Sequence, residues 1–177
     1  MPRPREFDID TALDAAVAAF WARGYAATSV RDLCDAMGLR PGSFYAAFGS
    51  KEACFRRALG RYLAKQRIPH EPGPDAVVAW FRGVLAPSRR GKGCLLVSSA
   101  VERPSLDDES AALVGDRLRA MEDFFRLCLA DRPTAPADAA LLGGAVVAIH
   151  VLVRAGSPPA RVRRLASRAL GAVGLSL

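Results

Sequence analysis

Residues 28–51 constrain the fold of this chain more than any other stretch, because their pattern predicts two short helices joined by a glycine turn. Ser29 can cap the first helix, and Asp32 stands at its third position, which is close to a capping box. Apolar residues then recur at the i, i+3, i+4 and i+7 spacing of one helical face, namely Val30, Leu33, Cys34 and Met37. Gly38 follows and suits the left-handed conformation that ends many helices.

A second short helix is predicted directly after this turn, over residues 41–48. Pro41 suits the first position of a helix, where a missing amide hydrogen costs nothing, and Gly49 closes the segment. Phe44 and Phe48 are four residues apart and therefore share one inward face. Two short helices with this turn between them predict a helix-turn-helix, whose second helix enters the major groove of DNA.

The same residues resemble a known DNA-binding domain. They carry the run T-S-x-x-D-L-x-x-A-M-G-L-x-x-G-S-x-Y-x-x-F-G-S-K, which is similar to the helix-turn-helix of the TetR/AcrR family of transcriptional regulators. The glycine, tyrosine, phenylalanine and lysine of the family's pattern fall on Gly42, Tyr45, Phe48 and Lys51. Residues 7–25 also fit the family's first helix. The resemblance implies a homodimeric DNA-binding regulator, most often a repressor that a small effector releases from a palindromic operator.

Two groups of residues are candidates for contacting DNA. Tyr45 and Lys51 resemble the phosphate contacts of the family, because a phenol and an ammonium both suit phosphate oxygens; ordinary surface residues are the alternative. Arg40, Pro41 and Ser43 are candidates for reading bases, since an arginine can grip guanine edges. A phosphate contact stays open for Arg40. Arg40 also replaces the small polar residue that often stands there in the family, so the base preference can differ.

Arg3 and Arg5 extend this set into a proline-spaced N-terminal tail. The tail is either disordered or an arm that reaches phosphates or the minor groove. The full set of candidate DNA-binding residues is Arg3, Arg5, Thr28, Ser29, Arg40, Pro41, Gly42, Ser43, Tyr45 and Lys51.

Composition sets wide bounds on partners and location. The chain has 177 residues, enough for one or two domains, and its net charge of +7 is compatible with a polyanionic partner without establishing one. The polar N-terminus lacks the apolar region of a secretory signal. The longest apolar stretch, residues 139–153, is too short to span a bilayer. We therefore expect a soluble cytoplasmic protein without a membrane partner.

Signatures of catalysis and of metal binding are absent from the sequence. It contains no G-x-S-x-G, no G-x-x-x-x-G-K, no H-E-x-x-H and no dinucleotide fingerprint. The four cysteines are scattered and fit neither a disulfide framework nor a zinc pattern. We therefore expect no enzyme, no cofactor and no bound metal, although a cysteine–histidine pair assembled by the fold stays open as the catalytic alternative.

Helical patterns continue through the rest of the chain without strand-like alternation. Asp8 or Asp10 can cap a first helix, and Ser50 can cap a long fourth one. Ser105 can cap another helix, with acidic residues in its first turn, where the helix dipole favours them. The later helices are predicted over residues 75–85, 94–101, 105–130, 137–154 and from about 157 onward.

The expected fold is all-α with about nine helices in two functional parts. Residues 1–48 form the helix-turn-helix DNA-binding domain, and residues 49–66 form a connecting helix that can act as a lever. Residues 67–177 form the domain that binds the effector and a second subunit. A DNA-binding protein that responds to no effector is the alternative, and it would lack a cavity in this second part.

Cys94 is the most distinctive residue of the second part. It stands near a predicted helix N-terminus and just after Arg89, Arg90 and Lys92, and both features favour the reactive thiolate. The segment GCLLVSSAVE also resembles a TetR/AcrR subset in which G-C-L opens this helix, so a repressor that senses oxidants or electrophiles is an alternative. The other interpretation is a buried cysteine that only packs.

The middle helices surround an effector pocket in the family, which implies a set of pocket residues here. His150 lies in an apolar helix and is either a core group or a polar group inside that pocket. The candidate effector-binding residues are Trp80, Cys94, Ser98, Met121, Phe124, Phe125, Cys128 and His150.

The last two helices are predicted to form the subunit interface. Residues 137–154 are apolar nearly all round, and Gly143 and Gly144 allow close approach of another helix. Two such helices from each chain predict a four-helix bundle with a twofold axis. The candidate interface residues are Leu142, Val146, Ile149, Val162, Leu165 and Ala169.

Overall fold

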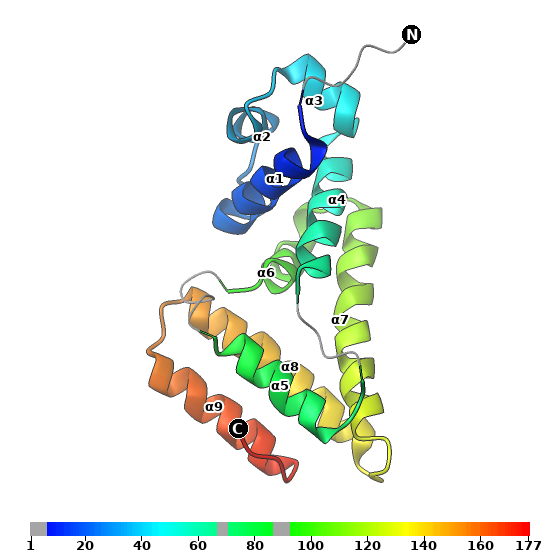
Figure 1. The fold of residues 1–177 in the computed structure, drawn as a ribbon, viewed down its shortest axis with the longest axis vertical. Coiled ribbons are helices and arrows are strands. Elements are labelled where there is room, and N and C mark those ends of the chain that lie inside the picture. The colour runs from blue at the N-terminus through cyan, green and yellow to red at the C-terminus, as the bar shows by residue number, and fades with distance from the viewer. Residues whose placement is uncertain (1–6, 67–70, 87–92) are drawn as a thin grey trace. The chain divides into compact units, whose positions relative to one another are not determined.

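The computed structural model describes residues 7–66, 71–86 and 93–177, and these residues are all-α, as predicted. They form nine α-helices and one short 3₁₀ helix, without a strand (Figure 1). In chain order the elements are α1 (Ile9–Arg23), α2 (Val30–Met37), α3 (Pro41–Phe48), α4 (Lys51–Ala64), α5 (Pro74–Val84), α6 (Leu95–Val101), η2 (Arg103–Ser105), α7 (Asp108–Cys128), α8 (Ala135–Arg154) and α9 (Pro159–Ala172).

The predicted helix starts of the first four helices are confirmed. The Asp8 carboxylate accepts the Asp10 amide at 2.9 Å and caps α1. Ser29 and Asp32 make the reciprocal bonds of a capping box on α2, and Ser50 caps α4 by accepting the Ala53 amide at 3.1 Å. These bonds satisfy amides that the first helical turn leaves without a backbone partner.

The predicted start of α7 at Ser105 is wrong, because the chain first makes one 3₁₀ turn around Pro104. The amide of Ser105 donates to the Glu102 carbonyl at 2.8 Å, and the amide of Leu106 donates to the Arg103 carbonyl at 3.1 Å. The helix then restarts after Asp107, whose backbone carbonyl accepts the amide of Ala111 at 2.8 Å. The aspartate therefore takes the capping role that the sequence suggested for the serine.

The chain forms two compact units. The first contains the described residues up to Gln66 together with Ser99–Leu113, and the second contains the described residues from 71 to Ser98 together with Val114–Leu177. The division into residues 1–48, 49–66 and 67–177 concerns function and stays a prediction. By packing, however, one segment from the later part of the sequence belongs to the first unit.

An aromatic cluster forms the core of the first unit. Phe20 of α1 and Phe55 of α4 are fully buried, with ring centroids 5.3 Å apart, and Tyr25 stacks on Phe20 and meets Phe55 edge-on. The inner face of α4 is buried as predicted, whereas Trp21 of α1 is only half-buried and packs against Tyr62 at the rim. Helix α1 therefore rests along α4 through large side chains.

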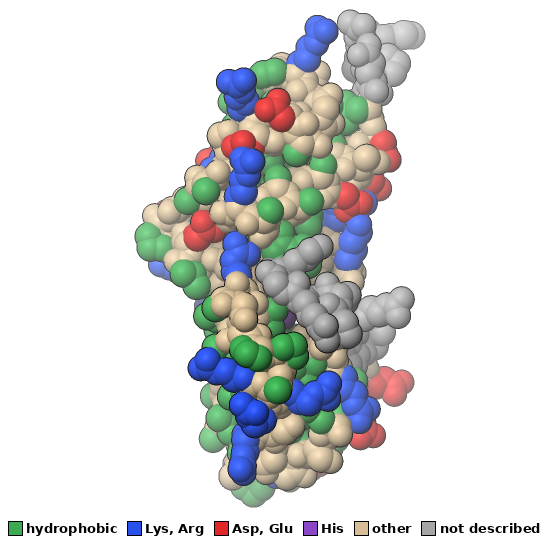
Figure 2. Space-filling view, turned by 90° about the vertical axis from the view of Figure 1, so that its left-hand side faces the viewer, with side chains coloured by type: hydrophobic (Ala, Val, Ile, Leu, Met, Phe, Trp, Pro, Cys, Tyr) green, Lys and Arg blue, Asp and Glu red, His purple; other side chains and the backbone are tan. Residues whose placement is uncertain are grey.

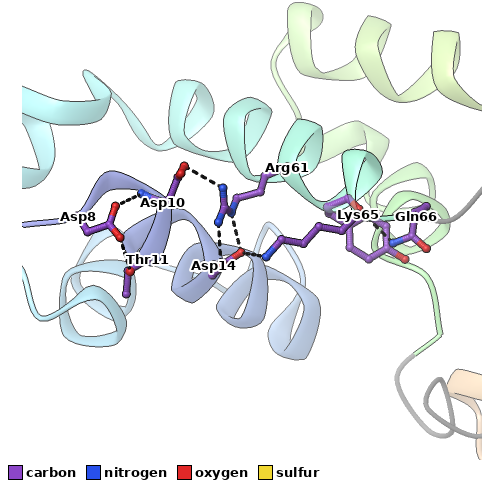
Figure 3. Close-up of polar contacts among 8 residues, drawn as sticks. Asp8, Asp10, Thr11, Asp14, Arg61, Lys65 and Gln66 are labelled. Carbon is purple, nitrogen blue, oxygen red and sulfur yellow. Dashed lines mark hydrogen bonds and ion pairs between the residues drawn. The ribbon is translucent and has the colours of Figure 1, made fainter.

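Charged side chains reinforce the packing of α1 on α4 (Figure 3). The Arg61 guanidinium donates to both carboxylate oxygens of Asp14, at 2.6 and 2.8 Å, and to Asp10 at 2.8 Å. The Lys65 ammonium also bonds to Asp14. Hydrogen bonds from Arg61 and Lys65 hold the pKa of the Asp14 carboxyl well below its usual range. This group of residues is called the α1–α4 clamp below.

Helix α8 is the centre of the second unit and packs against both α5 and α9. Four helices contribute fully buried side chains to one core: Phe81 of α5, Phe125 of α7, Leu142 and Ile149 of α8, and Leu170 of α9. Helix α8 is also the one described helix that is long and apolar enough to cross a membrane. Core helices of soluble proteins meet the same criterion, and one side of α8 is packed in this core.

The predicted interface residues lie mostly inside this core. Five of the six are buried within their own chain, and Leu165 is half-buried against the same cluster. They therefore do not form a surface that a second subunit can cover. The opposite side of α8 faces solvent instead, with Ala148 half-buried and the other four residues exposed, and we call it the α8 strip: Ala137, Leu141, Gly144, Ala148 and Val151.

Helix α9 exposes a different chemistry. Its solvent side carries Arg161, Arg163, Arg164 and Arg168. In Figure 2 the side of the second unit that carries α9 faces the viewer, and blue Lys and Arg side chains gather there. Arginines that met their own copies across a twofold axis would repel each other. The apolar α8 strip is therefore the better candidate for the centre of a subunit contact.

Loss of the α1–α4 clamp should weaken the first unit in a pH-dependent way. Asp14→Asn should lower its unfolding temperature at pH 7, because a carboxyl with a depressed pKa stabilises the folded state when ionised. The difference from wild type should stay constant down to about pH 4 and shrink below it, because the aspartate of the unfolded wild-type chain then takes up a proton while the folded one is still ionised.

Tryptophan fluorescence can follow this unit alone, since Trp21 lies in the first unit and Trp80, the other tryptophan, in the second. The measurement uses a Trp80→Phe background, with exposed Asp35→Asn as the matched control. An equal effect of both substitutions, or a difference that does not change with pH, would contradict the role of the clamp.

Candidate DNA-binding surface

Helix α3 has one side fixed in the core and the other open to solvent. Phe44 and Phe48 are buried, with ring centroids 5.3 Å apart, and they anchor the helix as predicted. Tyr45 is 52% exposed and lies edge-on to Phe44. The exposed residues of α3 and its N-cap are called the recognition face: Arg40, Pro41, Gly42, Ser43, Tyr45 and Ala46. Its polar and small groups suit a helix that enters a groove.

Gly42 gives the recognition face an accessible backbone. No atom of the described residues lies within 4 Å of a side chain built at this position, and the φ angle is not positive. Neither packing nor backbone conformation therefore requires glycine here. The missing side chain instead allows another molecule to approach the first turn of α3 closely.

The turn between α2 and α3 holds the recognition face in place. Gly38 adopts the left-handed conformation with φ 66° and ψ 30°, as predicted, and the amide of Leu39 bonds to the Cys34 carbonyl at 2.9 Å. Leu33 and Cys34 are buried beneath α2. The two helices of the predicted helix-turn-helix are therefore fixed to each other by backbone bonds and to α1 and α4 by the core.

Thr28 and Ser29, the two predicted DNA-contacting residues at the start of α2, differ in their exposure to solvent. Thr28 is fully buried, and its hydroxyl donates to the Gly24 carbonyl at 2.6 Å, so it braces the turn from the inside. Ser29 is exposed, and its hydroxyl belongs to the capping box with Asp32. Only Ser29 of this pair faces solvent, together with the neighbouring Arg31, which the sequence did not single out.

Lys51 stands at the first position of α4 and has a specific neighbour. Its ammonium lies 4.2 Å from the centroid of the Tyr25 ring, a cation–π contact. Partial burial lowers the pKa of Lys51, while Glu52 and Glu102 oppose this shift. Burial and a hydrogen bond to Glu52 raise the pKa of Tyr25 to about 12. The Tyr25 ring shields one side of the Lys51 ammonium from water, so this cation is less hydrated than that of an ordinary surface lysine. A less hydrated charge interacts more strongly with an anion such as a phosphate.

Two supporting residues were missed from the sequence. Arg57 of α4 donates to the Ala47 carbonyl at 3.0 Å and lies over the Phe48 ring, 5.0 Å from its centroid, so it secures the end of α3. Tyr25 positions Lys51. Cations near the last carbonyls of a helix are a known capping signal, but the pairing of Arg57 with α3 depends on the tertiary fold. Arg3 and Arg5 lie outside the described residues.

The predicted effector-binding residues all belong to the second unit, and five of them form a group of aromatic and sulfur-containing side chains there, namely Trp80, Met121, Phe124, Phe125 and Cys128. The Trp80 ring lies 5.4 Å from Phe124 and 5.1 Å from Phe125. Phe125 is fully buried, whereas Trp80, Phe124 and Met121 are half-buried. Cys128 is buried near Phe125, and burial raises the pKa of its thiol. These residues are therefore contiguous, and several of them reach the surface of the core.

The other three predicted effector-binding residues, Cys94, Ser98 and His150, are not part of this aromatic group. Cys94 is half-buried and precedes α6, where its carbonyl accepts the Ser98 amide at 2.9 Å. A side chain built on Gly93 would lie 3.1 Å from the His150 carbonyl, so this segment approaches the end of α8. The three cations predicted to activate Cys94 lie outside the described residues.

Comparisons with known proteins agree with this geometry. The model of the tetR family of bacterial regulatory proteins matches residues 12–58. The chain is 46% identical over 69 residues to the transcriptional repressor ComR of Escherichia coli strain K12, and 43% identical over 67 residues to the repressor BdcR of that strain. The alignments cover 39% and 38% of this chain, but only 33% and 34% of the two repressors, about a third of their length.

A solved structure extends the likeness to the whole chain. It contains a cysteine mutant of the TetR family transcriptional regulator CifR with 26-base-pair double-stranded operator DNA. That protein is 32% identical to this chain, with a TM-score of 0.80 and coverage of 96% of this chain and 99% of the other. The similarity therefore includes the second unit as well as the helix-turn-helix.

If Lys51 contacts phosphate, its loss should weaken binding to any duplex. Lys51→Ala should reduce affinity for random-sequence DNA and make the dependence of log affinity on log salt shallower by about one unit. Fluorescence anisotropy over a salt series measures both quantities. Lys65→Ala is the matched control, because that ammonium is occupied by Asp14. An unchanged salt slope for Lys51→Ala would remove it from the phosphate contacts.

Proposed function

Because the chain belongs to the TetR family of bacterial regulatory proteins, we propose that it is a DNA-binding transcriptional repressor. The recognition face carries this proposal: an exposed, core-anchored helix with an accessible glycine backbone stands beside Tyr45 and the partly desolvated Lys51. Phosphate contacts from the ends of α2 and α4 fix the register, and Arg40 and Ser43 read bases in the major groove. Its relatives are transcriptional regulators rather than enzymes.

The repressor acts as a homodimer on a palindromic operator. A twofold dimer presents two recognition faces, and only a spacing near one helical turn of DNA, about 34 Å, lets both enter successive major grooves. The α8 strip supports the dimer, because its residues recur at alternating steps of four and three, the spacing of an apolar helix seam. Leu141 and Val151 are each 47% exposed within the single chain.

A small effector bound by the second unit releases the repressor. The aromatic group around Trp80 and Phe124 supports an apolar or aromatic compound as the effector. Such a compound lowers operator affinity when it prefers a dimer whose recognition faces have another spacing. A hundredfold loss of affinity needs about 2.7 kcal/mol of differential binding between the two states. The repressor is soluble and acts in the cytoplasm, where its operator is.

Selection of bound sequences from a random DNA pool tests the function directly. The wild-type protein should enrich an inverted repeat, and two protomers should bind each enriched duplex in sedimentation measurements. Enrichment of no sequence above background would overturn the proposal. The Lys51→Ala variant serves as the matched control, since it should lose affinity without changing the enriched sequence.

Arg40 should determine the base preference at one operator position. Arg40→Ala should cost roughly 1–3 kcal/mol of discrimination at that position, because a bidentate contact to guanine is lost. Competition binding against duplexes with single-base changes measures the effect. Arg31→Ala, an exposed arginine on α2, is the control. An equal loss on every duplex would assign Arg40 to the phosphate contacts instead.

A charge on the α8 strip should separate the subunits without disturbing the core. Leu141→Glu should yield monomers in sedimentation velocity and lower operator affinity by at least about a hundredfold, because one half-site contact no longer supports the other. Leu127→Glu is the matched control, since Leu127 is an equally apolar residue of α7 that is 59% exposed. A dimeric Leu141→Glu variant would place the interface elsewhere.

A further inference from the structure

The segment Ser99–Leu113 links the two units by chain continuity. It packs within the first unit, whereas the residues before and after it, up to Ser98 and from Val114, belong to the second. It consists of the end of α6, the 3₁₀ helix η2 and the start of α7. Helices α6 and α7 therefore each run from one unit into the other.

Glu102 fixes this segment to the turn between α1 and α2. Its carboxylate accepts the backbone amide of Tyr25 at 2.7 Å and that of Ala26 at 3.3 Å. A side chain built on Gly24, which has φ 86°, would lie only 2.5 Å from one oxygen of this carboxylate. The close approach is possible because the position has no side chain. One acidic group thus satisfies two successive amides beyond the end of α1.

Arg56 of α4 fixes the other end of the segment. Its guanidinium bonds to Asp107 at 2.7 Å, to the Ser110 hydroxyl at 3.2 Å and to Glu109 at 2.9 Å. The start of α7 is therefore held on α4 by an ion pair that does not involve the α1–α2 turn. This separation allows the role of Glu102 to be tested independently of the general attachment of the segment.

Short paths lead from Glu102 to the candidate DNA contacts. Tyr25 bonds to Glu102 through its amide and holds Lys51 over its ring. The carbonyl of Gly24, beside the carboxylate, accepts the hydroxyl of Thr28 at 2.6 Å, directly before Ser29 and α2. The turn that Glu102 occupies therefore supports both the N-terminus of α2 and the N-terminus of α4.

We propose that Glu102 is a positioning residue for operator binding, through which the second unit controls the helix-turn-helix. Resting on the repressor function proposed above, it acts by holding the α1–α2 turn in the conformation that aligns Lys51 and α2 with the DNA backbone. Withdrawal of the carboxylate, when α6 and α7 rearrange, frees the two amides and lets these contacts move. Operator affinity then falls although every DNA-contacting residue is still present.

Glu102→Gln tests the proposal with an almost isosteric change. A glutamine side chain has one acceptor oxygen, and its NH2 group would face the second backbone N–H. It therefore cannot accept hydrogen bonds from both backbone amides. Hydrogen exchange at the Tyr25 and Ala26 amides, followed by NMR, should accelerate about tenfold, in keeping with a lost charge-assisted bond. Affinity for the selected operator should fall by about tenfold, with the unfolding temperature of the first unit nearly unchanged.

Matched variants separate positioning from other roles. Glu109→Gln removes a 73% exposed carboxylate from the same segment and should change neither the exchange rates nor the operator affinity. Gly24→Ala should reproduce the effect of Glu102→Gln, because its methyl group occupies the place of the carboxylate. In a Lys51→Ala background, Glu102→Gln should cost less than in wild type, since the two residues act through one ring.

The other outcomes overturn the inference in distinguishable ways. Unchanged exchange at Tyr25 and Ala26 would mean that the carboxylate does not hold the turn in solution. Faster exchange with an unchanged operator affinity would make Glu102 a structural residue only, and an equal gain of affinity on operator and random duplex would reduce it to a repulsive charge. A wild-type protein without operator preference would instead refute the repressor function itself.

Discussion

The packing of α1 along α4 is the interaction on which the first unit depends. Phe20 and Phe55 meet in its centre, and Arg61 ties α4 to Asp14 at its edge. Helices α2 and α3 are only eight residues each, too short to be stable alone. They keep their geometry because their buried faces rest on this pair. The precision of the recognition face is therefore a property of α1 and α4, which do not themselves carry its residues.

The local structure of the helix-turn-helix could be predicted because its signals are short in range. Ser29 with Asp32, the left-handed Gly38 and Pro41 at a first helical position each determine a helix end within a few residues. The start of α7 was predicted wrongly for a related reason. Ser105 and Asp107 are both residues that commonly cap helices. Which of them precedes α7 depends on whether the chain forms a 3₁₀ turn around Pro104 first.

Tertiary relationships could not be predicted in the same way. The apolar pattern of α8 showed that the helix is covered on more than one side, but not which side its own chain covers, so Leu142 and Ile149 were assigned to a subunit contact. Glu102 offered no pattern at all. Its partners are backbone amides about seventy-six residues away, and amides leave no trace in a sequence. Tyr25 and Arg57 were missed because their roles also depend on distant segments.

The exposed α8 strip has a consequence for the amount of protein a cell must keep. Apolar side chains such as Leu141 and Val151 are unfavourable in water along a continuous helix face. A protomer that needs a second copy to cover them has a free energy of unfolding that depends on its concentration. For the proposed dimer, dilution would therefore act twice, once by separating pairs and once by exposing single chains to aggregation and proteolysis.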